Sequence, residues 1–327
     1  MMPASGARRA ILLMGPTGSG KSDLSVQLAA ALPLEIISVD SAQVYRGMDI
    51  GTAKPPAALR ERVPHHLIDI RDAAQSYSAG DFTRDAVSVM QEIWSRGRHP
   101  LLTDGTMLYF HALSHGIAKL PAADPCLRAE IDAQAALKGW AELHRELAEL
   151  DPVAAARIHV NDPQRIQRAL EVYRLTGQTI TKLQQNRVSV FADVEVTEFV
   201  AAPLERSDLH TRIELRFEKM LDAGLLAEVR RFFERSDLTV EHPSMRAVGY
   251  RQMWRHLSGT CALSEAKDQA IAATRQLAKR QLTWLRQRQR ARWFDSMHSE
   301  VAGTMIDALS QGGFTTSSGV TPQGVLC

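Results

Sequence analysis

The sequence predicts an α/β protein in which helices flank a parallel sheet of the P-loop type and an all-helical domain is inserted. Apolar runs at residues 10–14, 34–39 and 100–103 alternate with helix-patterned segments such as residues 81–96. This alternation is typical of a parallel sheet. Between about residues 124 and 185 strand signals vanish and apolar residues recur with the helical period, which predicts the helical insertion.

The chain order suggests where the parts begin and end. Residues 191–201 alternate apolar and polar side chains, so we expect the chain to return to the sheet there as a strand. The last residues are rich in Gly, Ser, Thr and Pro and lack apolar periodicity. We therefore expect a flexible N-terminus at 1–9, a core formed by 10–123 and 190–310, a helical domain at 124–189 and a disordered tail at 311–327.

Bulk composition indicates an ordinary globular protein of 327 residues with 45% hydrophobic content. The net charge of +2 does not by itself indicate a nucleic-acid partner. Cys126, Cys261 and Cys327 lie far apart without C-x-x-C spacing, which argues against a disulfide framework and a structural zinc site. No segment reaches membrane-spanning length, and no heptad pattern indicates assembly. We expect a cytoplasmic monomer that does not bind membranes.

The segment that follows the first apolar run matches the phosphate-binding pattern G-x-x-x-x-G-K-[ST]. It consists of Gly15, Pro16, Thr17, Gly18, Ser19, Gly20, Lys21 and Ser22. In such a loop, glycines let backbone N–H groups converge on phosphate oxygens, a lysine adds a positive charge, and a serine can hold Mg²⁺. The strand pattern before it and the amphipathic helix after it argue against a chance glycine-rich turn. The segment predicts a diphosphate site.

Two acidic residues follow predicted strands. Asp40 comes after the second strand, at the edge of the sheet where ligands bind in open α/β folds. An aspartate there is equally typical of a turn or a helix cap. Asp104 ends the third strand, in the sequence Thr103-Asp104-Gly105-Thr106. It resembles the Mg²⁺-binding aspartate of nucleotide hydrolases, but a strand-end Asp-Gly is also an ordinary turn.

Basic residues occur in three groups. Arg212 and Arg216 share a helix face, which suits a phosphate clamp, but the neighbouring Glu214 and Glu218 favour a solvated face. Residues 164–168 form a similar polar helix face in the insertion. The third group, the basic run, contains no acidic residue from Gln269 to Phe294 and favours nucleic-acid binding. Its cations and interleaved tryptophans are Arg275, Lys279, Arg280, Trp284, Arg286, Arg288, Arg290, Arg292 and Trp293.

Taken together, an ordered set of motifs covering about residues 10–294 resembles the tRNA dimethylallyltransferase family. The motifs are Gly15 to Ser22, Asp40-Ser41-Ala42-Gln43-Val44-Tyr45, Gly51-Thr52-Ala53-Lys54-Pro55, Gly105-Thr106-Met107-Leu108-Tyr109, Asp162-Pro163-Gln164-Arg165 with Arg168-Ala169-Leu170-Glu171, Arg212-Ile213 with Arg216-Phe217, Val248-Gly249-Tyr250-Arg251, and Thr274 to Trp284.

One residue departs from the family pattern. The family usually has two glycines before the threonine of the Gly105-Thr106 motif, and here the first of them is Asp104. At an effective dielectric constant of about 20, two unit charges roughly 6 Å apart repel by about 3 kcal/mol. Asp104 must therefore point away from the diphosphate, pair with a cation, or coordinate Mg²⁺.

The resemblance implies transfer of the dimethylallyl group of dimethylallyl diphosphate to N6 of the adenosine 3′-adjacent to the anticodon of a tRNA. It implies catalytic roles for Asp40, Thr106 and Arg216, with Asp40 as general base, and a Mg²⁺ cofactor held at Ser22. It also implies that the anticodon stem-loop contacts a larger set: Asp40, Ser41, Ala42, Gln43, Thr106, Arg128, Gln164, Arg165, Ile166, Gln167, Arg168, Arg246, Ala247, Val248, Gly249, Tyr250, Arg251, Lys279, Arg280, Gln281, Leu282, Thr283, Trp284, Leu285 and Arg286.

Two other functions compete with this one. A nucleotide or small-molecule kinase, or an NTPase, would use the same phosphate loop, with Arg165 and Arg168 on a lid, but it leaves the basic run without a role. A non-catalytic RNA-binding module explains the basic run but leaves the phosphate loop and Asp40 without one.

Overall fold

The computed structural model describes residues 7–118, 120–185 and 187–315. The chain forms two compact units: Leu113–Ala192 is one, and the segments before and after it form the other. We call these the helical unit and the sheet unit. No helix in the described part of the chain is both long and apolar enough to cross a bilayer.

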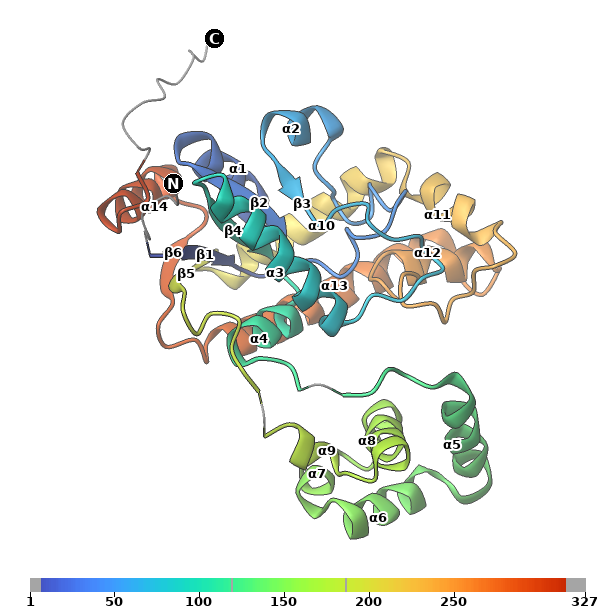
Figure 1. Cartoon of the computed structure of the whole chain (residues 1–327). Helices are drawn as coiled ribbons and strands as arrows, with labels where there is room; N and C mark the ends of the chain where they lie inside the picture. The colour runs from blue at the N-terminus through green and yellow to red at the C-terminus, as the bar shows by residue number, and fades with distance from the viewer. Residues whose placement is uncertain (1–6, 119, 186, 316–327) are drawn as a thin grey trace. The chain divides into compact units, whose positions relative to one another are not determined.

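The sheet unit is built on six parallel strands in the order β3-β2-β4-β1-β5-β6 (Figure 1). The strands are β1 (Arg9–Met14), β2 (Leu34–Ser38), β3 (His65–His66), β4 (His99–Asp104), β5 (Glu195–Ala202) and β6 (Arg292–Asp295). Helices connect them along the chain, as the alternating sequence pattern requires. The predicted α/β fold with a parallel sheet is confirmed.

Nine helices of the described chain belong to the sheet unit or begin in it. They are α1 (Lys21–Ala31), α2 (Ala57–Arg62), α3 (Ala79–Ser95), α4 (Met107–His115), α10 (Arg206–Asp222), α11 (Leu225–Phe233), α12 (Tyr250–Leu257), α13 (Leu263–Leu285) and α14 (Val301–Gln311). The start of α3 shows how local sequence fixes a boundary. The Ser78 hydroxyl accepts a hydrogen bond from the Asp81 N–H, and the Asp81 carboxylate accepts one from the Ser78 N–H, which is a capping box.

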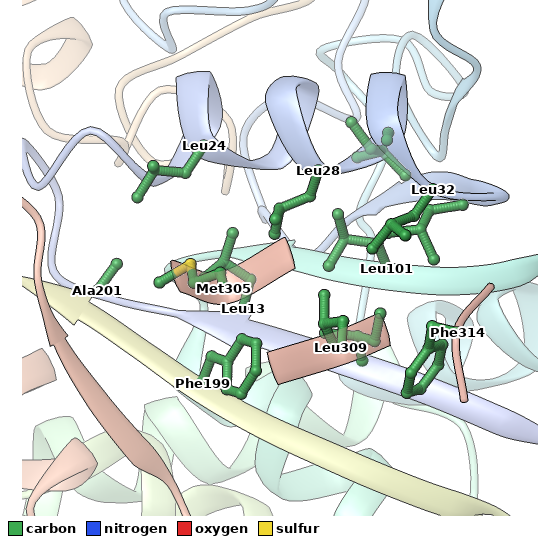
Figure 2. Packing of buried hydrophobic residues seen from close by; sticks show 14 of the residues in the cluster. Leu13, Leu24, Leu28, Leu32, Leu101, Phe199, Ala201, Met305, Leu309 and Phe314 are labelled. Carbon is green, nitrogen blue, oxygen red and sulfur yellow. The ribbon is translucent and has the colours of Figure 1, made fainter. Parts of the chain in front are cut away.

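One apolar core joins α1, the sheet and α14. Leu24 and Leu28 of α1 and Leu309 of α14 pack with Leu13 and Phe199 of the central strands (Figure 2). This packing continues beyond the last helix, because Phe314 is buried in the same cluster. Burial of a whole aromatic side chain stabilises a fold by about 2–3 kcal/mol, which keeps this part of the chain on the sheet.

Regular structure and buried residues reach closer to both ends of the chain than the sequence predicts. Arg9, within the predicted flexible N-terminus, begins β1, and its side chain donates to the Gly313 carbonyl and to Glu195. The predicted tail likewise starts too early, since α14 continues to Gln311 and Phe314 is buried. The remaining parts of the two predicted end segments, 1–6 and 316–327, lie outside the described residues.

Two strands were not predicted, and one begins later than predicted. β3 is only two residues long, too short for an alternating pattern. β6 lies inside the basic run, and Arg292 interrupts the apolar pattern by which a strand would be predicted. In the structure, the Arg292 guanidinium stacks over the Phe294 ring at 5.1 Å. β5 begins at Glu195 rather than at residue 191, because residues 191–194 form a turn.

The helical unit contains α5 (Pro125–Lys138), α6 (Trp140–Leu150), α7 (Pro152–Arg157), α8 (Pro163–Thr176) and α9 (Ile180–Leu183). Aspartate N-caps followed by proline begin three of these helices, which suits the residue preferences of helix starts. Ile131, Leu143, Leu147, Ile166 and Leu170 form its separate core.

Candidate functional site

Three strand ends meet at the carboxyl edge of the sheet. β1 lies beside β4 with Met14 opposite Asp104, and β4 lies beside β2 with Thr103 opposite Ser38. The phosphate loop follows β1 directly, Asp40 follows β2 by two residues, and Thr106 follows β4 by two. Parallel strand ends lie at one edge of a sheet, so these three segments form a single site.

The phosphate loop has the backbone that its glycines allow. Gly18 and Gly20 have φ angles of +83° and +91°, in the region that favours glycine. A Cβ added to Gly15 would lie 2.3 Å from the Ala201 carbonyl oxygen of β5, so only glycine fits there. Lys21 is buried, and its Nζ donates to the Pro16 carbonyl at 3.2 Å. Burial lowers the pKa of Lys21, and the negative charge of Asp104 opposes that shift.

Arg212 and Arg216 belong to the site rather than to a solvated face. Glu214 pairs with Arg275 and Glu218 pairs with Lys267, so neither glutamate neutralises the two arginines. The Arg212 Nε donates to the Gly18 carbonyl at 2.8 Å and so holds the loop from outside.

Arg216 is partly buried and forms no ion pair within the described residues. Burial lowers the pKa of its guanidinium, while the charges of Asp40 and Asp104 oppose this. A desolvated guanidinium without an ion pair is suited to binding an anion such as a phosphate.

Asp40 has the turn-forming role that the sequence allowed, and its catalytic role stays a prediction. Its Oδ1 accepts from the backbone N–H groups of Ala42 and Gln43, at 2.7 and 3.1 Å, and so closes the turn after β2. Its other oxygen accepts no hydrogen bond from the described residues. Thr106 ties this turn to β4, because its Oγ1 accepts from the Ser41 N–H at 3.0 Å. The carboxylate is thus oriented by one oxygen and offers the other to a ligand.

Asp104 lies inside the site. Its φ of +116° is in the region that glycine favours, which is consistent with the glycine that the resemblance led us to expect at this position. The Ser38 hydroxyl donates to its Oδ2 at 3.0 Å, and its side chain is buried. Burial raises the pKa of Asp104 to about 6, against the opposing charge of Lys21. The charge of Asp104 interacts with those of Lys21 and Arg216; its orientation toward a bound diphosphate and its coordination of Mg²⁺ stay predictions.

The residues predicted to contact tRNA divide into exposed, partly buried and buried groups. The exposed members are Ser41, Gln164, Arg165, Arg246, Arg251, Lys279, Arg280, Thr283 and Arg286. The buried members, which the protein itself covers, are Gln43, Ile166, Gly249, Tyr250, Gln281 and Leu285. The partly buried members are Asp40, Ala42, Thr106, Arg128, Gln167, Arg168, Ala247, Val248, Leu282 and Trp284. Only the exposed and partly buried groups can offer side chains to an RNA in this conformation.

Within the helical unit, two of the residues predicted to contact tRNA form internal ion pairs. Arg128 and Arg168 both donate to Glu171, which is fully buried and also accepts from the Asp124 N–H. Although burial opposes ionisation, the hydrogen bonds from Arg128 and Arg168 hold the pKa of Glu171 below its usual value. Removing either arginine would leave a buried carboxylate underpaired, which is strongly destabilising.

The basic run is also divided. Arg275 pairs with Glu214, Arg288 pairs with Glu198 and stacks over Trp284, and Arg292 stacks over Phe294. Lys279, Arg280, Arg286 and Arg290 are exposed, and in the part of the chain that the structure describes they form no ion pair. These four keep the single-sign charge that favours a polyanionic partner.

Sequence reasoning missed Glu228. This buried carboxylate accepts from the N–H groups of Asp49, Ile50 and Gly51 and from the Tyr250 hydroxyl. It thereby holds the Gly51 to Pro55 motif against α11 and α12. An acidic residue at a core-facing position of α11, between Leu225 and Val229, was the only available signal.

Comparison with known proteins agrees with this geometry. Residues 43–288 match the family model described as IPP transferase, and residues 8–75 match isopentenyl transferase. A tRNA dimethylallyltransferase of Nitrosococcus oceani is 59% identical over 282 residues, covering 86% of this chain and 90% of the relative. The chain belongs to the tRNA dimethylallyltransferase family.

Two solved structures of the family have the same fold. The tRNA isopentenylpyrophosphate transferase of Bacillus halodurans has a TM-score of 0.69 at 37% identity, covering 93% of this chain and 96% of its own. The tRNA delta(2)-isopentenylpyrophosphate transferase of Staphylococcus epidermidis has a TM-score of 0.66 at 31% identity, covering 93% and 98%. The predicted P-loop-type dimethylallyltransferase fold is thus confirmed.

The buried Asp104 makes stability depend on pH. Because its folded pKa is raised from 3.8 to about 6, the neutral form is favoured in the fold. Stability from this group is complete below about pH 4 and is lost as pH rises through 6, up to about 3 kcal/mol in total. We expect Asp104→Asn, which keeps an oxygen acceptor for Ser38, to avoid this loss.

The measurement is urea unfolding of both proteins at several pH values. The variant's advantage in unfolding free energy should grow by about 1–2 kcal/mol between about pH 5 and 7.5. The exposed substitution Asp222→Asn serves as the control and should give a constant difference. A constant difference for Asp104→Asn as well would show that its pKa is not raised.

Proposed function

We propose that this protein transfers the dimethylallyl group of dimethylallyl diphosphate to N6 of the adenosine 3′-adjacent to the anticodon in tRNA. Membership of the family supports the reaction class. The observation that carries the proposal is the single edge that joins the phosphate loop, Arg216 and Asp40. Among the described residues, Arg216 has no ion pair and one oxygen of Asp40 accepts no hydrogen bond. A leaving-group site therefore lies beside a proton acceptor, as a transfer from diphosphate to an amine requires.

In the proposed step, N6 forms a bond to C1 of the dimethylallyl group as the bond from C1 to the bridging oxygen breaks. The electron pair of that bond leaves with diphosphate, and a proton leaves N6. An adenine amine is a weak nucleophile because its lone pair is delocalised into the ring, so a positioned base helps as the new bond forms. Asp40 is the proposed base, since its Oδ1 is fixed by Ala42 and Gln43 while Oδ2 stays available.

The leaving group needs charge stabilisation that is already in place. Lys21 is buried and Arg216 is partly buried, and both supply positive charge to the site. The backbone N–H groups of Gly20, Lys21 and Ser22 lie at the start of α1. Donors held in a desolvated site stabilise developing negative charge without reorganising. Arg212 supports them by fixing the Gly18 carbonyl, so its role is to position the loop.

A Mg²⁺ ion fits the residues present. The described residues contain no group of three or more His, Cys, Asp or Glu side chains that could hold a metal alone. A magnesium ion bound to a diphosphate needs only one or two protein oxygens. Ser22 is exposed in the first turn of α1 and can supply one. When bound, the ion would neutralise charge on the diphosphate.

For the RNA, the anticodon stem-loop is the proposed partner because its unpaired bases can leave the stack and enter a site. The exposed cations Lys279, Arg280 and Arg286 of the sheet unit and Arg165 of the helical unit are the proposed phosphate contacts.

We also propose that the protein is a cytoplasmic monomer. The free thiols of Cys126 and Cys261 support a reducing compartment such as the cytoplasm.

The deciding experiment offers the purified protein unmodified tRNA together with either dimethylallyl diphosphate or ATP, and weighs nuclease digests of the RNA. We expect a gain of one C5H8 unit on the adenosine 3′-adjacent to the anticodon with dimethylallyl diphosphate only. Phosphate release from ATP without any gain in RNA mass would favour the kinase or NTPase alternative.

Asp40→Asn tests the proposed base. The asparagine keeps an oxygen that can accept from Ala42 and Gln43, so the turn should remain, while proton acceptance is lost. We expect turnover to fall by about two or more orders of magnitude, the usual range for a lost acid–base group. Binding of tRNA, measured by filter retention, should change little, and Asp222→Asn should behave as the wild type. Wild-type turnover in Asp40→Asn would remove this residue from the mechanism.

Lys279→Gln with Arg280→Gln tests the proposed RNA surface. If both side chains contact phosphates, affinity for tRNA should fall, and the slope of log affinity against log salt should become shallower by about 1.4–1.8. Arg62→Gln, which removes an exposed cation of α2, is the control. Arg165→Ala tests the helical unit in the same assay; Arg168 is avoided because its loss would unpair Glu171. An unchanged salt slope in the double variant would exclude this face of α13.

A further inference from the structure

Gln281 is a buried polar residue that joins two loops of the site. It lies on α13 with only 4% of its surface exposed. Its Oε1 accepts from the Thr17 N–H of the phosphate loop at 2.9 Å, and its Nε2 donates to the Gly105 carbonyl at 2.7 Å. Both ends of one amide are therefore used, by loops that follow different strands.

The contact continues from Gly105 to Asp40. The next residue, Thr106, donates its N–H to the Val39 carbonyl at 3.0 Å, and its Oγ1 accepts from the Ser41 N–H at 3.0 Å. Asp40 lies between these two partners. The phosphate loop is thus linked to the turn that carries the Asp40 carboxylate. Gln281 hydrogen-bonds the loop to Gly105, and the adjacent Thr106 hydrogen-bonds to the turn.

The cost of burying this amide argues that the contact is specific. A buried amide without partners costs several kcal/mol, whereas a fully satisfied one fixes the groups it joins. The absence of a side chain at Gly105 makes room for this contact, because an added Cβ would lie 2.5 Å from Gln281 Nε2. The Thr17 N–H points to Gln281, so in this conformation it is not among the loop donors aimed at a phosphate.

We infer that Gln281 is a positioning residue for the transfer reaction and not a tRNA contact. By joining Thr17 to Gly105 it sets the distance between the diphosphate site and the proton acceptor. The inference rests on the proposed function, which supplies the two groups whose separation matters. Reaction rates are sensitive to such spacing, since a misplacement of about 1 Å can cost about a hundredfold.

The test uses two substitutions that break the same contact from opposite sides. Gln281→Met keeps the length and volume of the side chain but removes both hydrogen bonds. Gly105→Ala adds the Cβ that collides with the amide, and Gly105 has no positive φ that would make alanine strained. The variant with both substitutions completes a double-mutant cycle. The matched control is Gln91→Met, which replaces an exposed glutamine of α3. Thermal melting checks that each variant is folded.

Three quantities are measured on each protein: the single-turnover rate at saturating tRNA and dimethylallyl diphosphate, the Kd for tRNA, and the Kd for inorganic pyrophosphate. We expect each single variant to lose about 10–100-fold in rate, with the Kd for tRNA within about twofold of wild type. The double variant should lose little more than either single one, because both remove one contact. Pyrophosphate binding should weaken by several-fold in the single variants, since the loop loses its anchor.

Two results would overturn the inference. A weaker Kd for tRNA with a wild-type rate at saturation would make Gln281 an RNA contact, and fully additive losses in the cycle would mean that the substitutions act separately. If Gln281→Met does not fold, Gly105→Ala alone decides between a lost rate and a wild-type rate. If the wild-type protein itself transfers nothing, the proposed function fails, and unchanged pyrophosphate binding in the variants would then reject the anchoring role independently.

Discussion

The parallel pairing of β4 with both β1 and β2 is the constraint on which the rest of the site depends. It fixes Met14 opposite Asp104 and Thr103 opposite Ser38, so three loops leave the sheet at the same level. A register shift of one residue would turn the strand-end side chains to the opposite face. The core beneath, packed by α1 and α14, prevents such a shift because it would expose the buried faces of these strands.

Electrostatics imposes a second constraint on this edge. Burial makes the charged forms of Lys21 and Arg216 costly, and the carboxylates of Asp40 and Asp104 offset that cost. Asp104 does so at a position whose φ of +116° suits glycine. A non-glycine residue there costs about 1–3 kcal/mol, and such strain persists only where the surroundings impose it. The Ser38 hydrogen bond and the two nearby cations are those surroundings, and a diphosphate would add negative charge to the same carboxylate.

Local patterns carried most of what the sequence could predict. The phosphate loop, the strands beside it and the position of Asp40 follow from residue order, because each is defined by a few consecutive residues. Glu228 was assigned no role, and Gln281 was predicted only as a tRNA contact through the resemblance. Their structural partners lie 22 to 179 and 176 to 264 residues away in the sequence. The only local sign was a polar side chain at a core-facing helix position. Charge alone does not separate internal from exposed cations, since Arg275 and Arg288 of the basic run form internal ion pairs.

The two faces of α13 explain why one sequence motif carries two kinds of residue. Ala278, Gln281 and Leu285 recur at helical spacing and are buried, whereas Lys279, Arg280 and Arg286 are exposed. A helix is stiff over this length, so the side chains of both faces keep fixed positions relative to each other. An RNA phosphate held by the outer face would thus be held at a fixed position relative to the amide that joins the phosphate loop to Gly105. The same rigidity accounts for a buried glutamine within a basic segment. Hydrogen bonds from the inner face of α13 fix the helix, so that the cations on its outer face are held in place for an RNA phosphate.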